Sequence, residues 1–179
     1  MLENLYGKIE HETRLVERAL VAASGRDTAH PDDRSGWSPI NPTYGHCDIY
    51  TEYVRNIWGK NEDGHWNSEA KILVWWIYSD KESFLCGPRK NKLTVHYSFK
   101  HPEYGIIDLA HNQFPDKTFL YPRPAPLSHT IPVQRPWDKT SEMKKRKELF
   151  EKTFIESLLR MPLTESVTPE FSTYLRKIA

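Results

Sequence analysis

One stretch of the sequence decides the fold: Trp37-Ser38-Pro39-Ile40-Asn41-Pro42-Thr43-Tyr44-Gly45-His46-Cys47-Asp48. Its two prolines and its glycine exclude a regular helix or strand up to position 45. A helical pattern begins directly afterwards, because apolar residues recur at steps of three and four and a glycine then ends the pattern. These residues are Cys47, Tyr50, Val54, Trp58 and Gly59. The spacing therefore predicts an amphipathic helix with Cys47 in its first turn.

The position of Cys47 favours a reactive thiol without requiring one. In the first turn of a helix, backbone N–H groups without a helical partner favour an anion. A helix terminus supplies at most about 2 kcal/mol, or roughly 1.5 pKa units. From a pKa of about 8.5, the thiol would be about half ionised at neutral pH, so a strong nucleophile also needs a cationic histidine. The alternative is that Cys47 is a small residue in the core.

Length and composition indicate one globular domain over residues 1–179. Hydrophobic residues make up 38% of the chain, charged residues 27% and aromatic residues 12%, which excludes a disordered or membrane-spanning protein. The net charge of +1 gives no reason to expect nucleic acid as a partner. Two cysteines indicate no disulfide framework, and neither a signal peptide nor an apolar run of membrane length is visible. We therefore expect a cytoplasmic protein that binds neither nucleic acid nor a membrane.

Three further stretches have the apolar periodicity of helices. The first covers residues 2–23 and is followed by a polar loop over residues 25–33. The second covers residues 141–160, and a short third helix begins at the Thr-Pro pair of residues 168–169. In the second helix, the basic residues 144–147 are followed by acidic residues one turn later. This pattern predicts a solvated helix face rather than a surface for nucleic acid.

Four segments predict strands. Residues 71–79 are apolar on both faces, which predicts a strand at the centre of a sheet, and residues 83–86 predict a short strand. Residues 92–99 alternate between apolar and polar side chains, and residues 106–110 return from them as the second strand of a hairpin. The proline-rich residues 114–137 predict an extended loop that wraps the domain.

The hairpin brings a histidine and an aspartate together. His96 lies on the polar face of its strand, and if Phe99 pairs with Gly105, Asp108 lies directly opposite His96. Side chains opposed in this way start about 4.5–5.5 Å apart at Cβ, so an imidazole and a carboxylate can form a hydrogen bond. A shift of one residue would put Asp108 on the other face. The alternatives are a structural histidine and an exposed aspartate at an edge or turn.

Together these residues are the parts that a thiol nucleophile needs. In chain order they are Cys47 at a helix start, His96 on a strand and Asp108 on the next strand. The histidine takes the thiol proton and holds the thiolate as an ion pair, while the carboxylate fixes the tautomer of the imidazole. The backbone N–H groups around His46 and Cys47 are candidates for an oxyanion hole.

Four motifs follow one another along the chain: Trp37-Ser-Pro-Ile-Asn41-Pro42-x-x-Gly45-x-Cys47, His96-Tyr97, Ile107-Asp108-Leu109 and Gln113-Phe114. In these motifs, which cover about residues 36–115, the chain resembles the YunG-like family of bacterial and phage proteins. That family is similar to the papain-like superfamily, near its NlpC/P60-like branch. The resemblance implies an α+β fold in which N-terminal helices, one of them carrying Cys47, pack on an antiparallel sheet and C-terminal helices follow. It also implies Cys47, His96 and Asp108 as the catalytic triad.

The chain departs from the family beside the cysteine. The family usually has Gly-Gln-Cys followed by small residues, whereas this chain has Gly45-His46-Cys47-Asp48. A carboxylate beside the thiol opposes thiolate formation unless solvent or a cation screens it. We expect His46, Gln113 and Trp37 to contact the substrate.

Two functions compete. The first is a cysteine hydrolase or acyl transferase that acts on an amide or isopeptide bond of a small molecule, peptide or protein. The second is an inactive papain-like module with a binding or regulatory role. We expect no metal and no cofactor, since the histidines and cysteines show no CxxC or HxxxH spacing. Cys86 is a rival nucleophile, but its position at a strand end favours a packing role.

Overall fold

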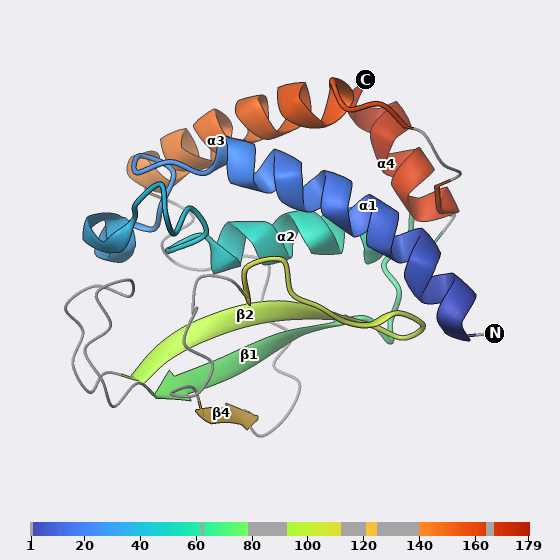
Figure 1. Cartoon of the computed structure of the whole chain (residues 1–179), viewed down its shortest axis with the longest axis horizontal. Helices are drawn as coiled ribbons and strands as arrows, with labels where there is room; N and C mark the ends of the chain where they lie inside the picture. Colours follow the sequence, from blue (N-terminus) through green and yellow to red (C-terminus); the bar gives the residue numbers. More distant parts are fainter. Residues whose placement is uncertain (1, 62, 79–92, 112–120, 125–139, 164–166) are drawn as a thin grey trace.

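The computed structural model describes residues 2–61, 63–78, 93–111, 121–124, 140–163 and 167–179 (Figure 1). Its helices are α1 (Leu2–Ala23), the 3-10 helix η1 (Pro31–Gly36), α2 (Cys47–Trp58), α3 (Ser141–Leu159) and α4 (Pro169–Ile178). Its strands are β1 (Lys71–Tyr78), β2 (Leu93–His101), β3 (Gly105–Ile107) and β4 (Tyr121–Pro124). Helices come before and after the strands, so the predicted α+β class is confirmed.

The described strands form one antiparallel sheet in the order β3-β2-β1-β4. β1 lies between β2 and β4, which confirms the central position predicted for residues 71–79. The strand predicted for residues 83–86 lies outside the described residues.

β4 corrects the prediction of an extended loop at residues 121–124, while the rest of the range 114–137 lies outside the described residues. Its residues pair with β1, with Pro122 opposite Ile77 and Pro124 opposite Trp75. The prolines suggested a loop because proline has no N–H group for a strand ladder. An edge strand tolerates proline where that N–H group would point away from its neighbour, and β4 is an edge strand.

The helix that carries Cys47 is the central layer of the fold. Figure 1 shows α2 between the sheet and an outer layer made of α1, α3 and α4. α2 packs on β2 and on α4, and α1 packs along α3. Because α2 is covered on two sides, most of its residues are buried. They are Cys47, Ile49, Tyr50, Thr51, Val54, Ile57 and Trp58.

A buried carboxylate joins three helices at one end of the core. Glu12 of α1 is fully buried and accepts a hydrogen bond from the Trp58 indole N–H of α2 (3.1 Å). It also accepts from the hydroxyl (2.8 Å) and the backbone N–H of Thr168, the N-cap of α4. A buried carboxylate with several hydrogen-bond donors is satisfied, so this cluster fixes how α1, α2 and α4 meet.

Among the helices described, none is both long and apolar enough to cross a membrane.

Candidate functional site

The turn before α2 presents Cys47 in one defined position. Gly45 has φ +75°, and a Cβ there would lie 2.8 Å from the Cβ of Asp33, so only glycine fits without strain. The His30 N–H donates to the Gly45 carbonyl (2.8 Å). The next residue but one, Cys47, is the first residue of α2, as the periodicity predicted. The glycine turn therefore decides where the helix begins and where the thiol lies.

His46 is an interior residue. Its ring is fully buried, with Nδ1–H donating to the Tyr44 carbonyl (2.9 Å) and Nε2 accepting from the Thr28 hydroxyl (3.0 Å). Burial, followed by the positive charge of Arg146, lowers the pKa of His46 to about 4, so the ring is neutral at physiological pH. Its backbone N–H donates to the Thr43 carbonyl (3.1 Å). Both ring nitrogens and the His46 N–H thus have partners within the protein, which gives no support to a substrate contact by His46 or to an oxyanion hole that uses its N–H.

Arg146 of α3 also binds the turn that precedes α2. Its side chain is fully buried, and its guanidinium makes a bidentate ion pair with Asp48 (3.0 and 3.1 Å). It also donates to the backbone carbonyls of Thr28 (2.6 Å) and Gly45 (3.0 Å). A planar guanidinium with five donors suits such a site. The charge of Asp48, which the sequence placed beside the thiol, is thus neutralised by a cation from a distant helix.

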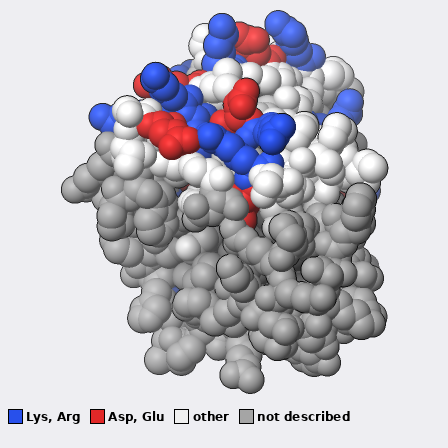
Figure 2. All heavy atoms as spheres, turned by 90° about the vertical axis from the view of Figure 1, so that its left-hand side faces the viewer, with Lys and Arg blue, Asp and Glu red and all other residues white. Residues whose placement is uncertain are grey.

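The buried Arg146 corrects the prediction for the basic residues 144–147. Lys144 and Lys145 are exposed, as a solvated helix face requires, but Arg146 points into the protein. On the face drawn in Figure 2, basic and acidic side chains are interspersed over the described surface. Arg34 of η1 and Glu142 of α3 form an ion pair (2.7 Å).

The hairpin between β2 and β3 has a different register from the predicted one. β2 extends to His101, which pairs with Gly105, so Phe99 pairs with Ile107 instead of Gly105. A three-residue turn and a glycine with φ +75° close the hairpin. β3 ends at Ile107, so Asp108 follows the strand at a position level with Ser98. The register is shifted by two residues, and a shift of two keeps every side chain on its predicted face.

Because the face is preserved, the expected hydrogen bond is present. His96 Nε2 lies 2.7 Å from Asp108 Oδ2, although the two residues are diagonal neighbours rather than directly opposed. The other oxygen, Oδ1, accepts from the Ala110 N–H (3.2 Å), and the Asp108 carbonyl accepts from Nδ1–H of His111 (2.7 Å). These bonds hold the carboxylate in place just beyond the strand end.

The structure also brings His96 to Cys47. Burial alone would lower the pKa of His96, but hydrogen bonds to Asp108 and to Cys47, together with the negative charges of both, raise it to about 9. At neutral pH the imidazole is therefore protonated. Because Nε2 is directed to Asp108, Nδ1 is the ring nitrogen that remains for the bond to the sulfur. A cation in this position favours the thiolate form of a cysteine.

Access to the three residues is restricted. Cys47 is 9% exposed and His96 4% exposed, while the Asp108 side chain is 25% exposed. The sulfur is therefore nearly, but not completely, enclosed. Trp37 is half-buried and its Nε1–H donates to the Pro42 carbonyl (3.1 Å), an intraprotein bond that fixes the ring. Gln113 and Cys86 lie outside the described residues.

The described residues contain no group of three or more histidine, cysteine or acidic side chains that could hold a metal ion.

The sequence analysis missed one important residue, Arg146, although the sequence contains a signal for it. Met143, Arg146, Phe150 and Phe154 recur at steps of three and four, so Arg146 falls on the apolar stripe of α3. A cation on a buried stripe implies a buried anion to pair with it.

Comparison with protein-family models, with curated proteins and with solved structures gives no match for this chain. The resemblance to the YunG-like family therefore stays a prediction. The chemistry of the site has to be argued from its geometry.

Proposed function

We propose that this protein is a cysteine hydrolase or acyl transferase that acts on an amide or isopeptide bond through Cys47, His96 and Asp108. One observation carries the proposal: three side chains distant in sequence meet at the start of α2, with His96 hydrogen-bonded to both of the others. A structural histidine needs neither a thiol partner nor a charge at neutral pH. The combination of thiol, imidazolium and carboxylate is the one that nucleophilic catalysis by cysteine requires.

The geometry suggests a role for each residue. The Cys47 thiolate attacks the carbonyl carbon, and the new C–S bond gives a tetrahedral intermediate. His96 Nδ1–H then protonates the leaving nitrogen as the C–N bond breaks, which leaves a thioester on Cys47. His96, now neutral, takes a proton from water or from an acceptor amine, whose attack releases the acyl group. Asp108 keeps Nε2 protonated and so directs Nδ1 to the sulfur throughout.

The ion pair between Arg146 and Asp48 removes one objection to this chemistry. An isolated carboxylate in the residue after the nucleophile would disfavour the thiolate. With a buried guanidinium bound to both of its oxygens, Asp48 adds little net negative charge beside the sulfur. Departure from the family motif at this position is therefore compatible with a reactive thiol.

The predicted family, location and substrate class belong to the same proposal. A helix that starts at the nucleophile and packs on the strand bearing the histidine fits a papain-like arrangement and a YunG-like family member. A cytoplasmic location fits two cysteines in a chain of 179 residues. The substrate remains a small molecule, a peptide or a protein.

A second candidate is an inactive module that keeps this fold for a binding or regulatory role. The 9% exposure of Cys47 and the burial of the His46 ring favour it, because they leave little room for a substrate. The two candidates differ in whether Cys47 forms an acyl intermediate.

Acetylation by p-nitrophenyl acetate tests the proposal. We expect a burst of p-nitrophenolate near one equivalent per chain, and mass spectrometry should locate the acetyl group on Cys47. Cys86→Ala should keep the burst and Cys47→Ala should lose it. Acetylation of both cysteines at the slow rate of a free thiol, unchanged in His96→Ala, would overturn the proposal and support the inactive module.

A further inference from the structure

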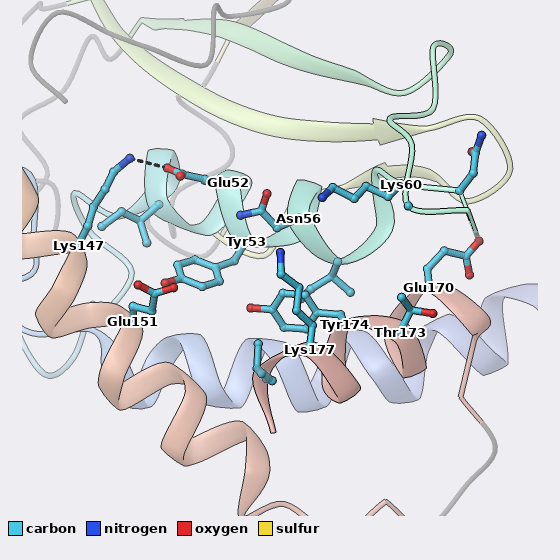
Figure 3. Close-up of a pocket in the computed structure, with 15 residues that line it drawn as sticks. Glu52, Tyr53, Asn56, Lys60, Lys147, Glu151, Glu170, Thr173, Tyr174 and Lys177 are labelled. Atoms are coloured by element: carbon cyan, nitrogen blue, oxygen red, sulfur yellow. Dashed lines mark hydrogen bonds and ion pairs between the residues drawn. The ribbon is translucent and has the colours of Figure 1, made fainter. Parts of the chain in front are cut away.

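A second concave site lies away from the triad. It is a pocket of about 340 Å³ on the side of α2 that faces α3 and α4, whereas the sheet lies on the other side of α2 (Figure 3). The described residues that line it do not include Cys47, His96 or Asp108. Its size falls within the range of small-molecule sites.

Part of the charge around this pocket is already paired or stabilised. Lys147 Nζ lies 2.8 Å from the carboxylate of Glu52. Glu170 lies in the first turn of α4, where helix N–H groups stabilise a carboxylate. Glu151 lies at the α3 end of the pocket, beside the Tyr53 hydroxyl (Figure 3). These groups border the pocket and leave its centre to other side chains.

Two lysines converge at that centre. In Figure 3, Lys177 rises from α4 toward Asn56 of α2, and Lys60 extends along α2 toward the same amide. Within the described part of the chain, neither lysine forms an ion pair. Lys60 lies over the Trp66 ring (4.7 Å), a contact that leaves its charge intact. Two ammonium groups and an amide donor form a local site of positive potential.

The walls beside the lysines are aromatic and aliphatic. Tyr53 and Tyr174 face the pocket (Figure 3), and the buried Ile57 also lines it. Burial, followed by the charge of Glu151, raises the pKa of both phenols, so each remains a neutral donor at physiological pH. Neutral rings next to two ammonium groups suit a ligand with an apolar body and one acidic group.

We propose that this pocket binds a small organic monoanion, whose carboxylate or similar acid group contacts Lys60, Lys177 and Asn56 and whose apolar body packs on the two tyrosines. The lining carries three lysines and three glutamates in all, so it does not suit a polyanion. The ligand would bridge α2 and α4, and its binding is independent of the chemistry at Cys47.

Isothermal titration with three probes that share one body tests this site: 3-phenylpropanoate, 3-phenylpropanamide and 3-phenylpropylamine. We expect the carboxylate to bind about tenfold or more tightly than the amide, because charge-assisted hydrogen bonds are lost with the charge. The amine should bind weakest. Perturbed NMR signals of Tyr53, Asn56 and Tyr174 should locate the bound carboxylate.

Matched variants distinguish binding of the carboxylate in the pocket from binding to lysines elsewhere on the surface. Lys60→Gln and Lys177→Gln should each weaken the carboxylate about tenfold and leave the amide unchanged, which also shows that the pocket is intact. Lys177→Arg should retain binding, and Lys152→Gln, on an exposed part of α3, should have no effect. No binding of the carboxylate, equal binding of carboxylate and amide, or tighter binding of the amine would each overturn the proposal. Cys47→Ala should bind the carboxylate as the unmodified chain does, whatever becomes of the catalytic proposal.

Discussion

His46 and His96 both adjoin Cys47, one in sequence and one in space, and both are almost completely buried. Burial lowers the pKa of each ring, yet the pKa of His46 falls to about 4 while that of His96 rises to about 9. The difference comes from the neighbouring hydrogen bonds and charges. His46 is near the guanidinium of Arg146, whereas His96 is bound to the carboxylate of Asp108 and to the sulfur.

The comparison shows how two buried histidines beside one cysteine can differ in charge. The neutral His46 ring uses both nitrogens within the loop and contributes to packing. The charged His96 ring lies between the sulfur of Cys47 and the carboxylate of Asp108. If this view is correct, changes at the two positions should affect different properties of the protein.

The largest expected effect is on the reactivity of Cys47. His96→Gln should slow its alkylation by iodoacetamide at pH 6–7 by about a hundredfold or more, because the cation that favours the thiolate is lost. His46→Gln should change the rate only a few-fold, since its ring is neutral. Peptide mapping by mass spectrometry measures the rate at Cys47 and at Cys86 in one sample. Equal losses in the two variants would show that the histidines do not differ in role.

The next effect is on the stability of the fold and concerns Arg146, whose positive charge helps to lower the pKa of His46. Arg146→Met should lower the free energy of unfolding by about 3–5 kcal/mol, because it removes the guanidinium that binds both oxygens of the mostly buried Asp48 carboxylate. Urea denaturation measures the loss. The control Lys145→Met, on the exposed face of α3, should stay within about 0.5 kcal/mol of the unmodified chain.

A double variant sharpens this prediction. Arg146→Met combined with Asp48→Asn should be more stable than Arg146→Met alone, because no unpaired charge remains. In either variant that folds, the pKa of His46 should rise from about 4, because the positive charge of Arg146 no longer adds to the effect of burial. The rise should be smaller in the double variant, which also loses the negative charge of Asp48 that raises this pKa. NMR titration of the ring measures this shift. A double variant no more stable than the single one would assign the loss to packing rather than to charge.

The helix at Cys47 and the shared face of His96 and Asp108 could be predicted from the sequence, for different reasons. Periodicity and the glycine turn fixed α2, because few conformations satisfy two prolines and a left-handed glycine. The predicted hydrogen bond is present although the register was wrong by two residues, because side chains alternate with a period of two. The register of a hairpin also depends on the length of its turn. The alternation of apolar and polar residues does not reveal that length.

The roles of His46 and Arg146 could not be predicted in the same way. A polar residue beside a cysteine looks accessible when only its neighbours in sequence are considered. The ring of His46 is enclosed by Thr28 and by α3, which starts almost a hundred residues farther along the chain. Arg146 looked solvated because it sits among lysines, and its burial depends on a carboxylate from another helix. Both outcomes follow from tertiary contacts rather than from local pattern.

The smallest expected effect is a pH dependence of stability with two opposite limbs. Because the pKa of His46 is lower in the folded state, its contribution is complete above about pH 6.5 and is lost as the pH falls toward 4. Because the pKa of His96 is raised, its contribution is complete below about pH 6.5 and is lost as the pH rises through 9. Each limb should amount to about 3 kcal/mol in urea denaturation.

Variants of the two histidines test the origin of each limb. His46→Gln should flatten the acid limb, and His96→Gln should flatten the alkaline limb. Cys47→Ala should also weaken the alkaline limb, because part of the raised pKa of His96 comes from the sulfur. An alkaline limb unchanged in both His96→Gln and Cys47→Ala would contradict an ion pair between these residues.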